Sequence, residues 1–309
     1  MTTVATGLVE RTRARPTWQR DLRALGAALV YLAPSLVLFA VFVFIPLGRT
    51  VYLSMFSTNP VGNPRNFIGL DWYGDLLTTA QFHRSLLTTF SFVLYTVPPG
   101  LALALALAVL ANCQLRGIGI FRTFFSSTIA VSLAVAATIW GLLMNPQLGL
   151  LNYLLGLIGV RGPNWLLDPG SALISVAVVT IWSTLGFNII VLLAGLQGIP
   201  DEIYEAARID GAVGFSIFRY VTLPLLSPSL FFLTVVNIIQ VFQAFTQIHV
   251  LTRGGPVDAT TALVYSIYLD AFVNFQFGYA SAQALVLFAI ILALTLFQFT
   301  VLERRVHYQ

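Results

Sequence analysis

Six long stretches without any charged residue constrain this chain more than any other feature of its sequence. They lie between consecutive charged side chains, over 24–48, 85–115, 123–160, 169–200, 220–252 and 271–302. A helix needs roughly 20 apolar residues to cross the hydrocarbon core of a bilayer, and each stretch is longer than that. The pattern therefore predicts an all-α integral membrane protein with six transmembrane helices.

Turn signals refine the bounds of the helices within these stretches. The third stretch is too long for one helix. Its helix is expected to end at Asn145-Pro146, because proline cannot continue a helix. Beyond this stop, 149–159 is predicted to form a short helix at the membrane interface. The expected spans cover approximately 24–48, 85–112, 123–144, 171–197, 224–250 and 281–302.

The arginines set the expected orientation. All sixteen basic residues are arginine, and eleven of them lie on the cytoplasmic side if the N-terminus is inside, as the positive-inside rule requires. Both termini are then cytoplasmic, with a basic tail over 1–23, a transmembrane domain over 24–302 and a short tail over 303–309. The first apolar stretch is too long for a secretory signal peptide, so we expect an uncleaved first helix.

Composition excludes several classes of function. Only 9% of the residues are charged, against about 25% in soluble domains. The spans contain no carboxylate and no arginine, which disfavours a proton- or sodium-coupled transporter. Without any lysine the chain has no P-loop, and its single cysteine and three scattered histidines offer no metal site. We therefore expect no catalytic residue, cofactor site or metal site in this chain.

Amide side chains in the fourth and fifth predicted spans are candidates for a functional face. At 100° per residue, the four in the fifth span fall on one side of a helix, and one in the fourth span could face them, as could Trp140, Trp182, Ser183 and Thr184. A buried amide is unfavourable unless it is paired or wetted. These residues therefore either join helices by hydrogen bonds or line a translocation path for a hydroxylated solute, and both readings stay open. They are Asn188, Asn237, Gln240, Gln243 and Gln247.

The segment 198–223 is the longest connection expected on the cytoplasmic side. Its first part, 201–210, predicts a short helix with recognisable ends. Pro200 suits the first helical position, acidic residues follow in the first turn, and Gly211 can take the left-handed conformation that ends a helix. A second helical piece over 213–222 is expected to end before the next proline. Taken alone, the segment could be a well-capped connector.

A motif in this loop identifies a family. The run Glu205-Ala-Ala-x-x-Asp-Gly-Ala212, followed by Phe218 and Leu223-Pro224, resembles the EAA loop of bacterial ATP-binding-cassette importer permeases. The resemblance implies the MetI-like fold of type I importers and a coupling helix seated in an ATPase subunit. The residues that it assigns to ATPase coupling are Glu205, Ala206, Ala207, Asp210 and Gly211. Without this resemblance, Glu205 would be interpreted only as an acidic residue on the helix surface that pairs with Arg208.

The resemblance extends over nearly the whole chain. The runs Phe67–Tyr73, Leu193–Gln197 and Leu251–Pro256 resemble permeases of the carbohydrate and polyol uptake group. Further runs resemble those of permeases in importers of sn-glycerol-3-phosphate or glycerophosphodiesters. They are Gly254–Thr261, Ala282-Gln283, and the ending Gln298-Phe299 with Glu303, Val306, Tyr308 and Gln309. Permeases for neutral disaccharides such as trehalose or maltose share most of these features and stay an alternative.

The resemblance also implies partners and a location. We expect a second permease subunit, two ATPase subunits that bind ATP and Mg, and an extracytoplasmic substrate-binding protein, in the inner (plasma) membrane of a bacterium. No nucleic-acid partner is expected. The outer loops would help to dock the binding protein, unless they are plain connections, through Trp72, Tyr73, Gly254, Gly255 and Pro256. A secondary transporter or a membrane scaffold is the alternative from another class.

Overall fold

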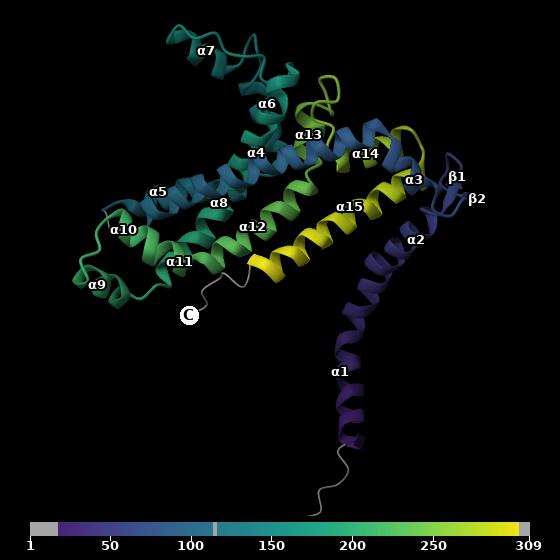
Figure 1. The fold of residues 1–309 in the computed structure, drawn as a ribbon, viewed down its shortest axis with the longest axis horizontal. Coiled ribbons are helices and arrows are strands. Elements are labelled where there is room, and N and C mark those ends of the chain that lie inside the picture. Colours follow the sequence, from purple (N-terminus) through teal and green to yellow (C-terminus); the bar gives the residue numbers. More distant parts are fainter. Residues whose placement is uncertain (1–17, 114–115, 303–309) are drawn as a thin grey trace, which may run out of the picture. The chain divides into compact units, whose positions relative to one another are not determined.

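The computed structural model describes the backbone of residues 18–113 and 116–302, which divide into two units after Tyr52 (Figure 1). The first unit is one apolar helical rod that contains the first predicted span. It consists of α1 (Trp18–Phe39), the π-helical η1 (Ala40–Phe44) and α2 (Ile45–Leu53). Most of the predicted N-terminal tail and the whole of the predicted tail 303–309 lie outside the described residues.

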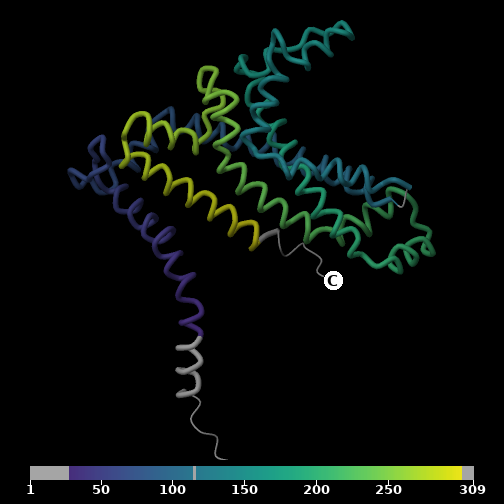
Figure 2. The backbone as a smooth tube through the Cα atoms, turned by 180° about the vertical axis from the view of Figure 1, so that it is seen from behind, coloured from purple at the N-terminus to yellow at the C-terminus, as the bar shows by residue number. Residues whose placement is uncertain are grey.

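The second unit is a helical bundle with one small antiparallel sheet. Figures 1 and 2 both show α15 running alongside α12 in this bundle. Its elements in chain order are β1 (Phe56–Thr58), β2 (Pro64–Phe67), α3 (Asp71–Thr78), α4 (Ala80–Ala111), α5 (Ile118–Ser126), η2 (Ser127–Ala130), α6 (Leu133–Leu143), α7 (Leu150–Leu157), α8 (Pro169–Gln197), α9 (Asp201–Ile209), α10 (Phe215–Ile217), η3 (Phe218–Thr222), α11 (Leu223–Leu225), α12 (Ser227–Phe242), α13 (Thr246–Leu251), α14 (Leu263–Tyr268), η4 (Leu269–Val273), α15 (Phe277–Phe297) and η5 (Gln298–Leu302).

The apolar helices account for four to six membrane spans among the described residues. Four helices are long and apolar enough to cross a membrane alone, and two bent pairs raise the number to six if each pair is one span. The four are Ala28–Leu53, Ala80–Ala111, Pro169–Gln197 and Phe277–Thr300.

Small side chains let α4 and α8 pack closely along their length. Residues 101–111 of α4 are only Leu, Ala and Val, which favour a continuous apolar helix. On its buried face Gly100, Ala104 and Ala108 follow one another at four-residue spacing. This is the small-residue pattern that allows two membrane helices to approach. Leucine and isoleucine side chains of α8, including the fully buried Ile189, fill the space opposite.

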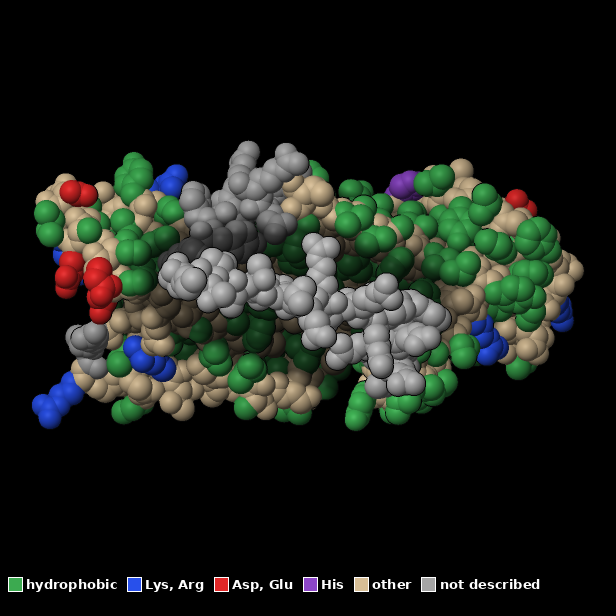
Figure 3. All heavy atoms as spheres, turned by 90° about the horizontal axis from the view of Figure 1, so that it is seen from below, with side chains coloured by type: hydrophobic (Ala, Val, Ile, Leu, Met, Phe, Trp, Pro, Cys, Tyr) green, Lys and Arg blue, Asp and Glu red, His purple; other side chains and the backbone are tan. Residues whose placement is uncertain are grey.

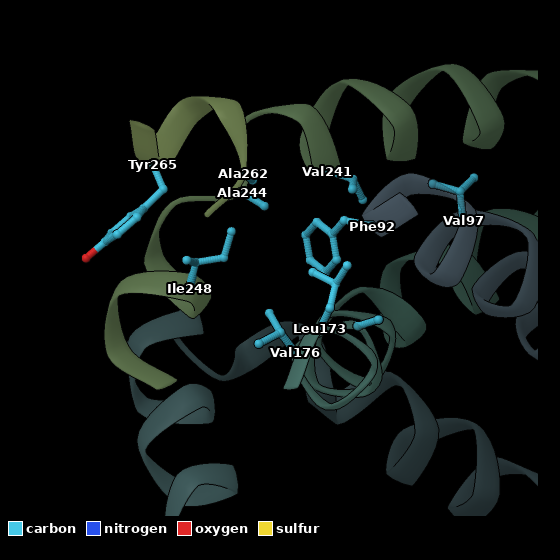
Figure 4. Packing of buried hydrophobic residues seen from close by; sticks show 10 residues of the cluster. Phe92, Val97, Leu173, Val176, Val241, Ala244, Ile248, Ala262 and Tyr265 are labelled. Carbon is cyan, nitrogen blue, oxygen red and sulfur yellow. The ribbon is translucent and has the colours of Figure 1, made fainter. Parts of the chain in front are cut away.

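The main core joins these two helices to α12 and α13. Figure 4 shows the Phe92 ring from α4 lying between Leu173 of α8 and Val241 of α12. Phe92 has no exposed surface, and Ile248 of α13 belongs to the same cluster. The core therefore fixes the ends of α12 and α13 against α4 and α8, and this is where the candidate site lies.

The predicted third span, 123–144, is not one straight helix. The chain bends by 104° between Ile118–Ala130 and Leu133–Leu143, with Val131 in an extended conformation. The bend packs against Gly186 of α8, whose N–H donates to Thr128 Oγ1 at 2.9 Å. A Cβ at residue 186 would lie only 2.9 Å from the Ser126 carbonyl oxygen, so a glycine opposite the bend lets the two backbones approach.

The second helical piece of the segment 198–223 also continues further than its sequence predicts. The helical piece expected to end before Pro224 runs through that proline to Leu225 and meets α12 at a 65° bend. Pro224 lies just after the π-helical η3, and prolines and π-bulges are sites where a helix kinks without ending. Residues 263–273, expected to be loop, form α14 and η4 instead.

Candidate translocation cavity and coupling helix

The predicted fifth span, 224–250, is broken at the centre of the bundle. The helix α12 ends at Phe242, and α13 begins at Thr246. Non-helical backbone at membrane depth is tolerated where it is buried in protein or lines a polar cavity. A cavity of about 280 Å³ lies at this break, between the ends of α12 and α13 and the middle of α8.

Hydroxyl and amide groups line this cavity. They come from Thr180, Ser183 and Thr184 of α8 on one side and from Gln240, Gln243, Thr246 and Gln247 on the other. The α8 hydroxyls donate to carbonyl oxygens of their own helix, such as Thr180 Oγ1 to Val176 O at 2.8 Å. Their oxygen lone pairs stay available to another donor. The lining residues include no charged side chain, which suits a hydroxylated solute.

Gln247 carries the clearest unmet hydrogen bond of the cavity. Its side chain is buried, with 3% exposed, and Nε2 donates to Thr180 Oγ1 at 3.3 Å. The buried Oε1 has no partner among the described residues. An unpaired buried acceptor is unfavourable by about 1–3 kcal/mol, so this oxygen is a place where a water or a solute hydroxyl gains a hydrogen bond.

Two of the five predicted amides do not line this cavity. Asn188 of α8 and Asn237 of α12 are buried and bond to each other, with Nδ2 to Oδ1 distances of 3.3 and 3.0 Å. Asn237 Nδ2 also donates to Leu233 O at 2.7 Å. For these two residues the geometry is that of an interhelical bond, whereas Gln240, Gln243 and Gln247 reach the cavity.

The helix α9 has well-defined ends. It begins at Asp201, so Pro200 is its N-cap residue and not the first helical residue as predicted. At its other end Gly211 has φ of 84°. The N–H of Gly211 donates to Arg208 O at 3.1 Å and the N–H of Ala212 to Ala207 O at 2.9 Å. This pair of bonds is a Schellman motif, which requires a left-handed residue that only glycine adopts readily.

The surface of α9 is almost wholly uncovered. None of its residues is buried, and Glu205, Ala206, Asp210 and Gly211 are exposed while Ala207 is partly covered. Within the described residues no ion pair joins Glu205 to Arg208, although they are three residues apart. Figure 3 shows the acidic side chains gathered at the end of the bundle that carries α9. Beside them three apolar side chains are also exposed, namely Ile209, Val213 and Phe215.

Few contacts hold α9 to the bundle. The Thr222 hydroxyl lies 3.5 Å from the Tyr204 hydroxyl, and a cleft of about 810 Å³ separates α9 from the last turn of α4. Arg208 and Asn112 lie on its lining. The helix is therefore a projecting element with an exposed acidic and apolar surface.

Two residues predicted to dock a binding protein, Trp72 and Tyr73, make contacts within the chain. Trp72 Nε1 donates to Phe56 O at 3.1 Å, and Tyr73 OH donates to Ser54 Oγ at 2.9 Å. The Trp72 ring also packs edge-on against Tyr279 at 5.6 Å. Both aromatic residues are half-buried, so they brace the small sheet against α15.

The predicted loop at Gly254, Gly255 and Pro256 is folded back on itself. The Thr261 hydroxyl donates to Gly254 O at 3.0 Å, and the Thr260 hydroxyl donates to Gly255 O at 2.8 Å. Gly254 is buried and the next two residues are half-buried, with a cis peptide bond between Gly255 and Pro256. The exposed residues of this loop are their neighbours Arg253, Val257 and Asp258.

An aromatic cluster lies beside the cavity. Phe245, which lines the cavity, stacks on His249 at 5.1 Å, and Tyr265 OH lies 3.4 Å from His249 Nδ1. Burial and the neighbouring Tyr268 raise the pKa of Tyr265, against a lowering by Arg253. The Tyr265 hydroxyl therefore stays protonated and can donate to His249.

The apolar bundle, its broken helix and the projecting α9 are the features expected of a membrane permease. The family described as "Binding-protein-dependent transport system inner membrane component" matches residues 77–308, and the chain belongs to this family. It is therefore a protein of the inner membrane.

Curated relatives narrow the similarity to one group. The chain is 39% identical over 279 residues to the sn-glycerol-3-phosphate transport system permease protein UgpA of Agrobacterium fabrum, covering 89% of this chain and 94% of that relative. It is 40% identical over 280 residues to UgpA of Brucella abortus, covering 90% and 94%. It is 34% identical over 299 residues to UgpA of Pectobacterium atrosepticum, covering 96% and 100%.

Solved structures share the fold at lower identity. The crystal structure of a bacterial alginate ABC transporter, in complex with an alginate pentasaccharide-bound periplasmic protein, matches with a TM-score of 0.82 and 21% identity. The match covers 94% of this chain and 98% of that one. A second alginate transporter structure matches with a TM-score of 0.79 and 22% identity, over 95% and 100% of the two chains.

The cavity includes residues that the amide pattern did not predict. Thr180 lies three and four residues before Ser183 and Thr184 on α8, so it shares a helix face with these two predicted residues, and this spacing was a usable signal. Thr246 has no such signal, because it reaches the cavity only through the break after Phe242. No glycine or proline marks that break.

Proposed function

We propose that this chain is the transmembrane permease subunit of an ATP-driven importer and forms half of its translocation path. In this proposal the chain crosses the membrane six times, each bent helix pair counting as one span, and both termini are cytoplasmic. The solute is sn-glycerol-3-phosphate or a glycerophosphodiester. The identity of 34–40% to glycerol-3-phosphate permeases, over 89–96% of this chain, supports that substrate.

The observation that carries the proposal is the exposed, capped helix α9. A structural connector would bury an apolar face fully, whereas Ile203, Tyr204 and Ala207 of α9 are only partly covered and none of its residues is buried. It presents Glu205 without an ion-pair partner among the described residues, and the small Ala206 beside it lets another protein approach the helix backbone. These features fit a helix that seats in a groove of an ATPase subunit.

The covalent path from α9 to the cavity is short. From Gly214 the chain forms α10, η3 and α11, meets α12 at the 65° bend and reaches the cavity where α12 ends. When two ATPase subunits bind ATP and Mg and close, α9 moves with them. The rigid α12 then carries that displacement to the break, and the cavity opens alternately to the two sides.

The remaining partners follow from the same proposal. A second permease subunit completes the path, and an extracytoplasmic substrate-binding protein delivers the solute to it. The chain itself holds no cofactor, since ATP and Mg are bound by the ATPase subunits. The exposed loop residues Val257 and Asp258 are better placed to meet the binding protein than the braced Trp72 and Tyr73.

One observation favours a second substrate class. The cavity lining has hydroxyls and amides but no charged side chain, and such a lining equally suits a neutral disaccharide. Trehalose or maltose is therefore the competing substrate within the same mechanism.

Uptake into proteoliposomes separates these possibilities. The complete importer, with both permeases, the ATPases and the binding protein, is reconstituted and supplied with labelled glycerol-3-phosphate, maltose or trehalose. We expect vanadate-sensitive uptake of glycerol-3-phosphate that an ionophore does not abolish. Uptake of a disaccharide alone would replace the substrate, and uptake that only an ionophore abolishes would refute the ATP-driven mechanism.

A further inference from the structure

A second polar pocket lies at the start of α4, away from the uncharged cavity. Its volume is about 200 Å³. One wall is formed by the first two turns of α4 and the other by the loop that follows α13. The lining residues are Ala80, Gln81, Arg84, Ser85, Asp258 and Thr261.

The α4 wall offers several groups suited to an anion. Within the described residues Arg84 has no ion-pair partner, and its side chain is exposed. Ser85 is buried, with 2% exposed, and lines the pocket while its hydroxyl has no hydrogen-bond partner among the described residues. Ser85 therefore presents to the pocket a hydroxyl that can donate to a ligand oxygen.

The N-terminus of α4 adds to this attraction. The helix has 32 residues, and its N-cap Thr79 makes no capping bond; the Thr79 hydroxyl donates to Asp75 O at 2.7 Å. The first N–H groups of the helix are therefore left without a side-chain cap. Uncapped N–H groups and the helix dipole together favour an anion at this end.

The opposite wall carries a negative charge. Asp258 lines the same pocket, yet no ion pair joins it to Arg84 within the described residues. Thr261 accompanies it, with its hydroxyl committed to Gly254 O at 3.0 Å. The pocket thus has a cationic wall and an acceptor wall, which suits a ligand with an anionic group at one end and hydroxyl donors at the other.

The two walls are tied together at the base of the pocket. One turn beyond Ser85, the Thr89 hydroxyl oxygen accepts a hydrogen bond from the Leu263 N–H at 2.8 Å. Thr89 has no exposed surface, so this bond is shielded from competing water. The separation of α4 from the loop is fixed there, and the pocket is a preformed space.

We propose that this pocket binds the phosphate group of a phosphorylated glycerol at the entrance to the path, with the phosphate toward Arg84 and a hydroxyl donating to Asp258. The inference rests on the proposed function, because that function supplies the anionic solute. With a volume of about 200 Å³, the pocket has room for a small polyol phosphate. It gives the phosphate the basic contact that the inner cavity lacks.

Chemical protection of Arg84 tests the inference without relying on transport. The complete importer is treated with phenylglyoxal, which modifies arginine, and the labelling of each arginine is measured by mass spectrometry. We expect glycerol-3-phosphate to slow labelling of Arg84 severalfold, inorganic phosphate to slow it less, and glycerol to have no effect. Arg161, an exposed arginine outside the pocket, is the matched control and should label at one rate throughout.

Variants of the second wall sharpen the test. Asp258→Asn removes the repulsion between carboxylate and phosphate, so inorganic phosphate should protect Arg84 at a severalfold lower concentration. Ser85→Ala should weaken protection by both phosphate compounds. Equal labelling of Arg84 with and without glycerol-3-phosphate would overturn the inference. Protection of Arg161 equal to that of Arg84 would also overturn the inference. So would faster labelling of Arg84 in Asp258→Asn without any ligand, because that result would indicate an ion pair between Arg84 and Asp258 in the wild type.

Uptake measurements distinguish this failure from failure of the proposed function. If the wild-type importer takes up no glycerol-3-phosphate, the proposed function and the inference fall together. If it takes up glycerol-3-phosphate while Arg84→Gln has the wild-type maximal rate at saturating binding protein, only the inference falls. We expect Arg84→Gln to lower that rate severalfold and Arg161→Gln to leave it unchanged.

Discussion

Replacing Gly211 with valine isolates the role of the end of α9. The residue has φ of 84°, and a Cβ added there would meet no atom within 4 Å. The substitution therefore introduces no clash, and its effect is confined to the backbone conformation that closes the Schellman motif. Because α9 has no buried residue, the membrane bundle should insert and fold as before.

The magnitude follows from the left-handed conformation. A residue with a Cβ pays about 1–2 kcal/mol to adopt it, and a β-branched side chain lies at the upper end of that range. The helix has no buried side chain whose packing offsets this strain. The population of the correctly ended helix should therefore fall by a factor of about 5–30 relative to the frayed form.

The assay measures solute taken up per ATP hydrolysed in reconstituted proteoliposomes. We expect Gly211→Val to retain ATP hydrolysis while uptake falls severalfold or more, and Gly211→Asn, which tolerates the left-handed region better, to lie closer to wild type. Gly159→Val is the matched control, since Gly159 has φ of 77° and equally open surroundings but follows α7, far along the chain from α9. A wild-type coupling ratio in Gly211→Val would refute the reasoning.

Three further predictions concern the amides and the acid of the coupling helix. Asn188→Leu should lower the unfolding temperature in detergent, because it leaves Asn237 without its partner. The double variant Asn188→Leu/Asn237→Leu should restore that temperature, with a coupling energy of about 0.6–1.7 kcal/mol between the two sites. If the losses from the two single variants simply add, the paired geometry is contradicted. Gln247→Leu should keep or raise stability, because it removes an unpaired buried acceptor, while slowing uptake severalfold; uptake at the wild-type rate would remove the cavity from the path. Glu205→Gln should leave the unfolding temperature unchanged and reduce co-purification of the ATPase at moderate salt, and full retention of the ATPase would contradict its assignment to coupling.

The parts of the fold that local chemistry controls were predictable from the sequence. The absence of charge over 85–115 and 169–200 places α4 and α8 within a few residues, because a long apolar stretch in a membrane has to satisfy its own backbone as a helix. The left-handed Gly211 was predictable for a similar reason, since glycine alone takes that conformation at little cost. Only the first residue of α9 was misplaced, by one position.

The breaks in the helices were not predictable, because their causes lie elsewhere in the chain. The 104° bend after Ala130 depends on Gly186, 58 positions beyond Thr128. The break after Phe242 lies between apolar and polar residues that are all compatible with a helix. A helical wheel drawn through that break placed Asn237 and Gln247 on one face. The structure separates them, since one bonds to Asn188 and the other turns toward the cavity.

The distribution of charge suits the passage of an anion better than its retention. At an effective dielectric of about 20, a cation 4 Å from a phosphate attracts it by about 4 kcal/mol, which corresponds to roughly a thousandfold slower release. A hydroxyl or amide contributes about 0.5–1.5 kcal/mol. A solute held by Thr180, Gln243 and Gln247 can therefore leave readily, whereas an arginine in their place would trap it. Conduction requires binding that is favourable enough for the solute to enter and weak enough for it to leave. Arg84 is exposed, and in bulk water a cation 4 Å from a phosphate attracts it by only about 1 kcal/mol, so the uncharged cavity and an exposed arginine at the start of α4 are compatible parts of one path.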